Sequence, residues 1–155
     1  MRYHEMCPCG CFNTFVDQEV DFIREFKYWF LALNCDQGFL GRSLLILKAH
    51  KVDQVEMIDA EMFELHRIYC HWRRAIERAF QPDKINQAQL GNDELLHRGH
   101  LHWHFVPRYR RPISFLGVEF HSDEIESQKL NYCLVQKRVI CPVEVRRGIR
   151  DLLLS

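Results

Sequence analysis

The sequence predicts an α+β domain in which one long helix packs on a face of a small antiparallel sheet. Short aromatic and aliphatic runs are separated by glycines and prolines, and a single long stretch repeats apolar residues at helical spacing. The 155 residues, 47 % of them hydrophobic, suit one domain with its own core. We therefore expect a single domain over residues 1–155.

The first expected elements are two strands. Residues 27–33 (KYWFLAL) and 43–48 (SLLILK) are apolar runs that are each too short for a helix. Gly38 and Gly41 punctuate the interval between them, as glycines do in turns. We expect the two runs to pair as antiparallel strands.

The long helix follows His50. Its apolar stripe steps by fours and threes through Ile58, Met62, Leu65, Tyr69, Trp72, Ile76 and Ala79. Asp53 and Glu56 have the spacing of a capping box, and Pro82 stops the helix just after Phe80. We expect the stripe to pack on the sheet.

Two further strands are expected after the helix. Residues 84–92 (KINQAQLGN) alternate between two faces and close on a Gly-Asn turn. Residues 100–106 form the next strand, and Pro107 is expected to end it because proline cannot donate to a sheet ladder.

The last part of the chain offers two short elements. Residues 115–120 suit a short strand. Residues 143–154, opened by Pro142, suit a short helix with one apolar side formed by Val145, Ile149, Leu152 and Leu153.

Charge and composition exclude several classes of partner. Lys plus Arg and Asp plus Glu each number 21, so the formal charge is zero and broad capture of nucleic acid or acidic membrane is disfavoured. No apolar run approaches the roughly 20 residues of a membrane span. The N-terminus carries charges and cysteines where a signal peptide is apolar. We expect a cytoplasmic protein that binds neither nucleic acid nor membrane.

The cysteine usage indicates reduced thiols, since seven is an odd number and no secretion signal is seen. Three of the cysteines, Cys7, Cys9 and Cys11, crowd together near the N-terminus. This segment is either a mobile terminus or a thiolate pair that a distant histidine completes into a metal site. One residue separates successive cysteines, where zinc sites usually have two to four, and this favours the mobile terminus.

The most informative segment is GHLHWHFVPR, residues 99–108. Side chains alternate along a strand, so His100, His102 and His104 share one face while the apolar residues between them share the other. A single histidine is more often a structural residue, but three at steps of about 6.5–7 Å suit a polyanion or a metal. The strand is expected to carry chemistry on one face and core on the other.

The run HLHWHFV at residues 100–106 resembles the histidine triad signature His-φ-His-φ-His-φ-φ, in which φ is apolar. The following Pro-Arg is similar to bacterial and Fhit-like members and to the diadenosine polyphosphate hydrolases. The resemblance covers residues 27–108, where the strand pair, long helix and LGN strand occur in the family's order. It implies a histidine-triad-like fold with this core and a C-terminal extension at 109–155. It also implies a nucleotide hydrolase or transferase, usually a homodimer, that acts on an α-phosphate.

The resemblance implies a role for each histidine of the triad. His102 would be the nucleophile, and a neutral imidazole, with an unperturbed pKa of about 6.5, suits attack on phosphorus through a nucleotidyl-histidine intermediate. The backbone carbonyl of His100 would orient it. His104 would lie against the α-phosphate and donate to its oxygens.

Other positions match residues that bind substrate in the family. Asn34 corresponds to an acidic or Asn residue that holds the ribose, and Asn92 to a polar residue of the phosphate pocket; the alternative is that both merely form turns. Arg108, the first residue of a basic cluster, offers bidentate contacts to polyphosphate.

Two positions depart from the family pattern. His97 stands where a phosphate-binding hydroxyl is usual, which leaves recognition of the leaving group open. The family's Gly-His step on the second strand is here Gly41-Arg42. Arg42 is either a permanent cation for phosphate or a solvated strand residue.

No cofactor is required by this chemistry, but the resemblance offers a zinc site. In some bacterial relatives a residue at the position of His50 joins the first triad histidine and an N-terminal cysteine pair around zinc. The corresponding weak candidates here are Cys7, Cys9, His50 and His100.

The leading interpretation is hydrolysis of dinucleoside polyphosphates or nucleoside phosphoramidates, which releases a nucleoside monophosphate. Relatives that act as nucleotidyltransferases tend to carry Gln at the third triad position, where this chain has His104. The alternative from another class is a non-catalytic nucleotide- or zinc-binding module.

Overall fold

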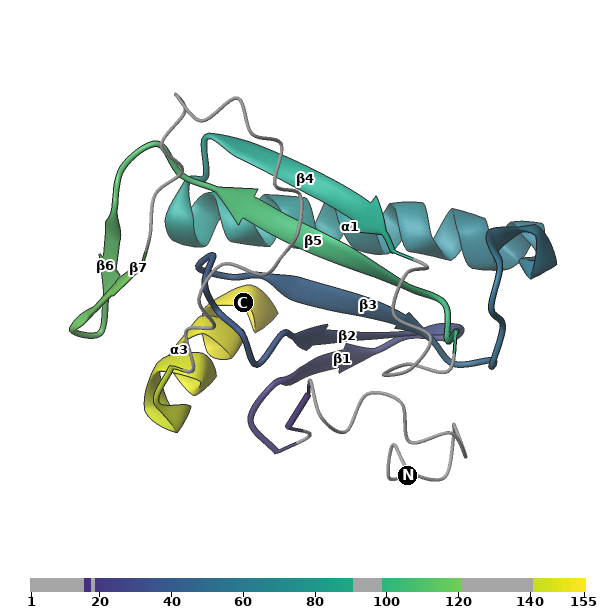
Figure 1. The fold of residues 1–155 in the computed structure, drawn as a ribbon, viewed down its shortest axis with the longest axis horizontal. Coiled ribbons are helices and arrows are strands. Elements are labelled where there is room, and N and C mark those ends of the chain that lie inside the picture. The colour runs from purple at the N-terminus through teal and green to yellow at the C-terminus, as the bar shows by residue number, and fades with distance from the viewer. Residues whose placement is uncertain (1–15, 18, 91–98, 121–140) are drawn as a thin grey trace.

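A computed structural model describes residues 16–17, 19–90, 99–120 and 141–155 of the chain. Its centre is a five-stranded sheet of order β1-β2-β3-β5-β4 with every neighbouring pair antiparallel (Figure 1). The strands are β1 (Phe22–Glu25), β2 (Trp29–Leu33), β3 (Ser43–Leu47), β4 (Lys84–Gln89) and β5 (His102–Arg108). This architecture confirms the predicted α+β class.

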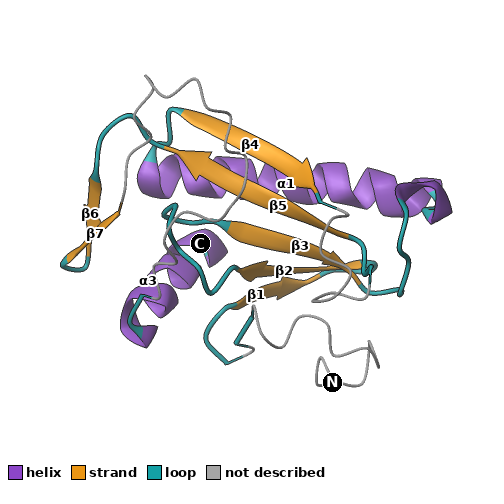
Figure 2. Cartoon of the chain, in the orientation of Figure 1, coloured by secondary structure: helices purple, strands orange, loops and turns teal. Residues whose placement is uncertain are grey.

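The long helix α1 (Asp59–Phe80) lies along one face of the sheet, and the C-terminal helix α3 (Val143–Leu154) lies beside it near one end (Figure 2). The main core fills the space between this face and the two helices. It includes Leu31, Leu45 and Trp103 from the sheet and Trp72 and Ile149 from the helices. A smaller apolar cluster, with Phe30, Leu44 and Ile46, lies on the opposite face.

The stripe predicted for α1 is correct in its middle and shifted at its ends. Leu65, Trp72 and Ile76 are buried against the sheet as expected, whereas Ile58 and Met62 are exposed. Other buried positions of the helix are Ile68, Ala75 and Phe80. The first turn meets the sheet at Glu61 instead, which is buried and whose carbonyl oxygen accepts from Trp29 Nε1 at 2.9 Å.

The capping box predicted at Asp53 and Glu56 is present, but it caps a separate turn. The Oδ1 of Asp53 accepts from Val55 N and the Oε1 of Glu56 accepts from Asp53 N, each at 2.9 Å. This box begins the short 3₁₀ helix η2 (Gln54–Glu56). The chain then extends, and α1 begins at Asp59 with Glu61 accepting from Ile58 N.

One strand was missed, and two strand predictions need correction. β1 was not predicted at all. β5 starts at His102, after His100, and runs through Pro107, because the ladder with β3 ends at Phe105 and Pro107 faces only β4. The strand expected at residues 115–120 is a hairpin of β6 (Ile113–Phe115) and β7 (Val118–Phe120), turned by two residues with positive φ.

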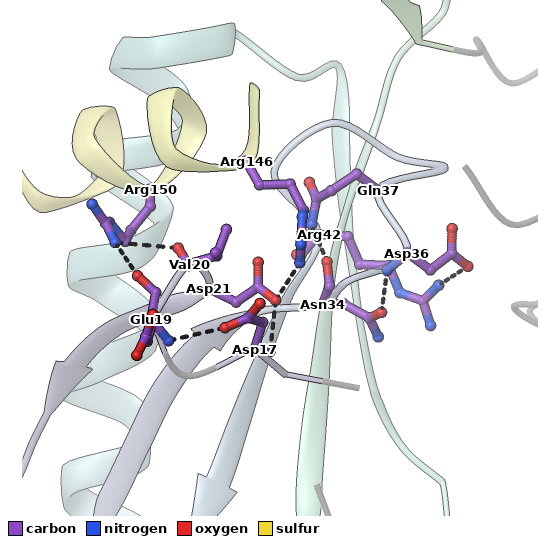
Figure 3. Close-up of polar contacts among 10 residues, drawn as sticks. All are labelled: Asp17, Glu19, Val20, Asp21, Asn34, Asp36, Gln37, Arg42, Arg146 and Arg150. Atoms are coloured by element: carbon purple, nitrogen blue, oxygen red, sulfur yellow. Dashed lines mark hydrogen bonds and ion pairs between the residues drawn. The ribbon is translucent and has the colours of Figure 1, made fainter. Parts of the chain in front are cut away.

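Helix α3 forms as predicted, with Val145, Ile149 and Leu153 buried and Leu152 exposed. A buried ion pair joins it to the segment before β1: Arg146 Nη1 lies 2.5 Å from Asp21 Oδ2 (Figure 3). Burial raises the pKa of the Asp21 carboxyl, and the Asp17 amide and Arg146 oppose that effect. Among the helices in the described ranges, none has the length and hydrophobicity to cross a bilayer.

The loop between β2 and β3 approaches α1 closely at Gly41. The residue has φ 83°, and a Cβ built there would lie 2.2 Å from Ile76 Cδ1. Gly117 has a similar φ of 77°, but a Cβ there would meet no atom within 4 Å. A substitution at Gly117 therefore tests the cost of the backbone conformation alone, whereas one at Gly41 adds the cost of the close approach to Ile76.

We expect Trp103→Ala to lower the free energy of unfolding by about 3–5 kcal/mol, because this side chain lies in the core between the sheet and α1. Urea unfolding of the purified variant measures the change. The control is Phe63→Ala on the outer side of α1, where the aromatic ring is 73 % exposed and its removal should cost little. Equal losses in the two variants would mean that Trp103 does not lie in the core.

We expect Gly41→Ala to cost about 2–5 kcal/mol, the sum of a left-handed alanine and a forced overlap with Ile76. Gly117→Ala should cost only the first part, about 1–2 kcal/mol. Adding Ile76→Val, which removes the overlapping Cδ1, should make the double variant more stable than the sum of the two single changes predicts. Strict additivity in the same unfolding measurement would rule out the steric contact.

Candidate functional site

The three histidines lie where β5 runs beside β3. His102 is opposite Ile46 and His104 is opposite Leu44, while His100 lies just before the strand. All three are buried, at 2 %, 3 % and 7 % exposure in chain order. Leu101, Trp103 and Phe105 face the main core, so the predicted division of faces is confirmed.

Hydrogen bonds fix the orientation of each imidazole. His100 Nε2 lies 2.6 Å from the carbonyl oxygen of Leu47, and His102 Nδ1 lies 2.8 Å from the carbonyl oxygen of His100. The Nε2 atoms of His102 and His104 are 3.1 Å apart, with their ring planes at 67°. The three rings are thus held by the backbone and by one another.

The loop from β2 to β3 carries a polar cluster of Asn34, Asp36, Gln37 and Arg42 (Figure 3). Arg42 brings this cluster into contact with His104. Asn34, at the end of β2, is 3 % exposed, and its Oδ1 accepts from Asp36 N at 2.8 Å. The Gln37 amide donates to the carbonyl oxygens of Asn34 and Arg42, at 2.6 and 2.8 Å. Asn34 therefore does form a turn, the alternative weighed from the sequence, although this leaves a contact to ribose open.

Arg42 lies in this loop, directly before β3. Its side chain is buried, so the interpretation as a solvated strand residue is wrong. Nη1 lies 3.1 Å from Asp36 Oδ2, and Nη2 lies 3.5 Å from His104 Nδ1. The structure thus brings Arg42 to the third histidine of the triad.

Arg108, another expected substrate-binding residue, lies further along β5 than the triad. Arg108 shares the face of His104 by strand alternation, but four residues along a strand span about 13 Å. Its guanidinium stacks on the Phe39 ring, 4.6 Å from the centroid. Asn92 and His97 lie outside the described residues.

Of the four candidate zinc ligands, the structure describes the two imidazoles, those of His50 and His100. The rings of His50 and His100 meet edge to face with centroids 4.9 Å apart. Cys7 and Cys9 lie outside the described residues, and within the described ones no group of three or more metal-binding side chains forms. Two neutral donors alone fall short of the four-ligand set of a structural zinc site.

Asp36 was not predicted from the sequence to take part in the site. Its Oδ1 accepts from Gly38 N at 3.0 Å and its Oδ2 holds Arg42, so this carboxylate organises the loop. The signal was an Asp two residues after an Asn and two before a Gly, a pattern typical of turns that use side-chain oxygens. The ion pair with a residue six positions later has no comparable local signature.

Comparisons with known proteins identify the fold. No protein-family model matches the chain, and no curated protein matches it. Among solved structures, a hypothetical histidine triad nucleotide-binding protein from Sulfolobus tokodaii aligns with a TM-score of 0.67 and 18 % identity, over 96 % of this chain and 89 % of that one. A histidine triad protein from Sinorhizobium meliloti aligns with a TM-score of 0.64 and 18 % identity, over 92 % and 96 %.

A zinc-bound histidine triad family protein from Mycobacterium smegmatis is also similar, with a TM-score of 0.56 and 20 % identity over 85 % of this chain and 82 % of that one. At these identities the likeness concerns the arrangement of the backbone. The chain therefore has the fold of histidine triad proteins, as the motif at residues 100–106 predicted.

Proposed function

We propose that this chain is a histidine triad enzyme, a nucleotide hydrolase that acts at an α-phosphate through a covalent intermediate on His102. The observation that carries the proposal is the 2.8 Å contact between His102 Nδ1 and the carbonyl oxygen of His100. A carbonyl oxygen only accepts, so the proton of a neutral imidazole sits on Nδ1 and Nε2 carries the lone pair. That lone pair is the nucleophile the reaction needs.

The proposed first step is attack of His102 Nε2 on the α-phosphorus. A P–N bond forms while the bond to the leaving group breaks, and its electron pair departs with that group. His102 then carries positive charge, which the Nδ1–H bond to the His100 carbonyl stabilises. Donors beside Nε2, above all His104, favour the charge that develops on the phosphoryl oxygens.

The proposed second step is hydrolysis of the nucleotidyl-histidine. A water oxygen attacks phosphorus and loses a proton to solvent, and the P–N electron pair returns to His102 Nε2. A nucleoside monophosphate is released and the enzyme is restored. No metal ion takes part in either step.

For the substrate we propose a dinucleoside polyphosphate or a nucleoside phosphoramidate, as in the Fhit-like and diadenosine polyphosphate hydrolase branches that the motif resembles. His104 at the third triad position favours hydrolysis over nucleotidyl transfer, because the transferases of the family tend to carry Gln there. Asn34, Arg108, Asn92 and His97 are the proposed substrate-binding residues. A homodimer is proposed on the same resemblance.

Zinc is a second possibility, supported by the close rings of His50 and His100 and by the zinc-bound neighbour of similar fold. In such a site Cys7 and Cys9 would supply thiolates. The metal would hold the N-terminal segment against the start of β5, a structural role that leaves the chemistry at His102 unchanged.

We expect His102→Ala to lose turnover by on the order of 10⁴-fold or more, because it removes the group that forms the covalent bond. The assay measures AMP release from diadenosine tetraphosphate and from an adenosine phosphoramidate, without added metal. Protein denatured in detergent at alkaline pH, where a P–N bond to histidine survives, should carry a nucleotidyl adduct in the wild type and none in the variant. Nucleotide binding, measured by calorimetry, should change little.

The control for that experiment is His66→Ala, which removes an exposed histidine on α1. It should keep full activity. AMP release that survives in His102→Ala would remove the proposed nucleophile. A folded wild type that binds nucleotide and releases AMP from neither compound would favour a non-catalytic binding module instead.

We expect Asn34→Ala to raise KM for ribonucleotide substrates by about 2- to 10-fold, the equivalent of one neutral hydrogen bond, and to raise it less for 2′-deoxy analogues. Asn34→Asp keeps an oxygen that accepts from Asp36 N and should behave nearly as the wild type. Steady-state kinetics with the paired substrates provides the comparison. An equal rise for both sugars would show that Asn34 acts only through the turn.

A further inference from the structure

The geometry points to Arg42 as a positioning residue, held by Asp36, that keeps Nδ1 of His104 without a proton and so directs the single N–H of His104 toward His102. The inference rests on the proposed function only in giving His102 the role of nucleophile. The contacts that support it form a continuous chain from Asp36 to His102.

The first contact in this series is the one between His102 and the backbone of His100, which fixes where the proton of His102 lies. The His100 carbonyl places the proton of His102 on Nδ1, which leaves a lone pair on Nε2. His104 Nε2 lies 3.1 Å from that atom, and two ring nitrogens at this distance share one proton. Because His102 Nε2 has none, His104 Nε2 is the donor.

Arg42 lies at the other nitrogen of the same ring. A guanidinium has five N–H donors and no acceptor, so it faces His104 Nδ1 favourably only when Nδ1 carries a lone pair. The separation from Nη2 is 3.5 Å, at the outer limit of a hydrogen bond, and the positive charge acts over that distance as well. Both effects oppose a proton on Nδ1 and favour the one on Nε2.

Asp36 keeps Arg42 in this position. Arg42 and Asp36 are 5 % and 8 % exposed, and their ion pair spans 3.1 Å. Asp36 is itself held in place. Its Oδ1 accepts from Gly38 N, and its backbone N–H donates to Asn34 Oδ1. The carboxylate thus compensates the positive charge of the buried guanidinium.

The arrangement serves the reaction because it makes His104 a donor before the substrate arrives. The Nε2–H of His104 points at His102 Nε2, the nitrogen that attacks phosphorus. During the attack the phosphoryl oxygens lie next to this nitrogen and gain negative charge. A His104 with its proton on Nδ1 would turn a lone pair toward those oxygens. Arg42 therefore acts through His104, a role distinct from both of those weighed from the sequence, a cation that binds phosphate and a solvated strand residue.

The test is the ¹⁵N shift of His104 Nδ1 followed against pH in protein without nucleotide, with His104→Gln providing the assignment. Among the described residues, the charged or titratable groups that face His104 are Arg42, with Asp36 behind it, and His102. We expect Nδ1 of the wild type to lack a proton at pH 7. In Arg42→Met the midpoint for its protonation should rise by about one pH unit.

A second variant covers the case in which Arg42→Met does not fold because the buried ion pair with Asp36 is lost. Asp36→Asn/Arg42→Met removes both buried charges and should raise the midpoint in the same direction. Arg110→Met is the control, since its side chain is 62 % exposed and pairs with Asp83 away from the triad. A proton on Nδ1 in the wild type at pH 7, or a midpoint that neither variant moves, would overturn the inference.

Kinetics separate positioning from phosphate binding. We expect Arg42→Met to lower kcat by about tenfold or more and to leave KM nearly unchanged, since the lost effect lies in the transition state. A rise in KM at constant kcat would instead make Arg42 a substrate contact. Because the titration needs no substrate, a wild type that titrates as expected but hydrolyses no nucleotide would contradict the proposed function alone.

Discussion

Burial of β5 on both faces is the constraint on which the site depends. Trp103 and Phe105 enter the core under α1, and His102 and His104 are also buried on the opposite face. A slip of one residue would exchange the two sets, placing imidazoles in the apolar core and aromatic rings in the site. Pairing with β3 on one side and β4 on the other excludes that slip. The hydrophobic core therefore sets the register of the face that carries the histidines.

The same core reaches Arg42 through the residues on either side of it. Trp72 on α1 donates to Ser43 Oγ at 2.9 Å, and the Ser43 hydroxyl donates to the Gly41 carbonyl at 2.9 Å. Tyr109, just past β5, donates to the Leu40 carbonyl at 2.8 Å. With its neighbours fastened to the helix and to the end of the triad strand, the backbone at Arg42 has little freedom. The long side chain is then oriented by Asp36.

The histidine face was predictable from the sequence because strand alternation needs no knowledge of the tertiary structure. β1 was not, since two of its four residues are charged and its pairing with β2 contains an irregularity. The capping box at Asp53 was found, but whether the chain continues into α1 depends on packing beyond the local signal. Asp36 was not singled out from the sequence, because its ion pair with Arg42, six positions later, has no local signature. Local rules thus located the face that carries the histidines, whereas the contact of Arg42 with His104 depends on how the loop packs beside β5.

Arg42 occupies the position where the histidine triad resemblance expects a histidine, and the exchange has a physical consequence. A histidine at this position can donate or accept a hydrogen bond, so it does not determine which nitrogen of a neighbouring imidazole carries the proton. An arginine only donates, so it favours a nitrogen without a proton. A buried arginine also needs an opposite charge close by, which a neutral histidine does not. Asp36 supplies that charge from within the same loop, at 3.1 Å. The arginine and the aspartate therefore form one ion-paired unit in this buried position.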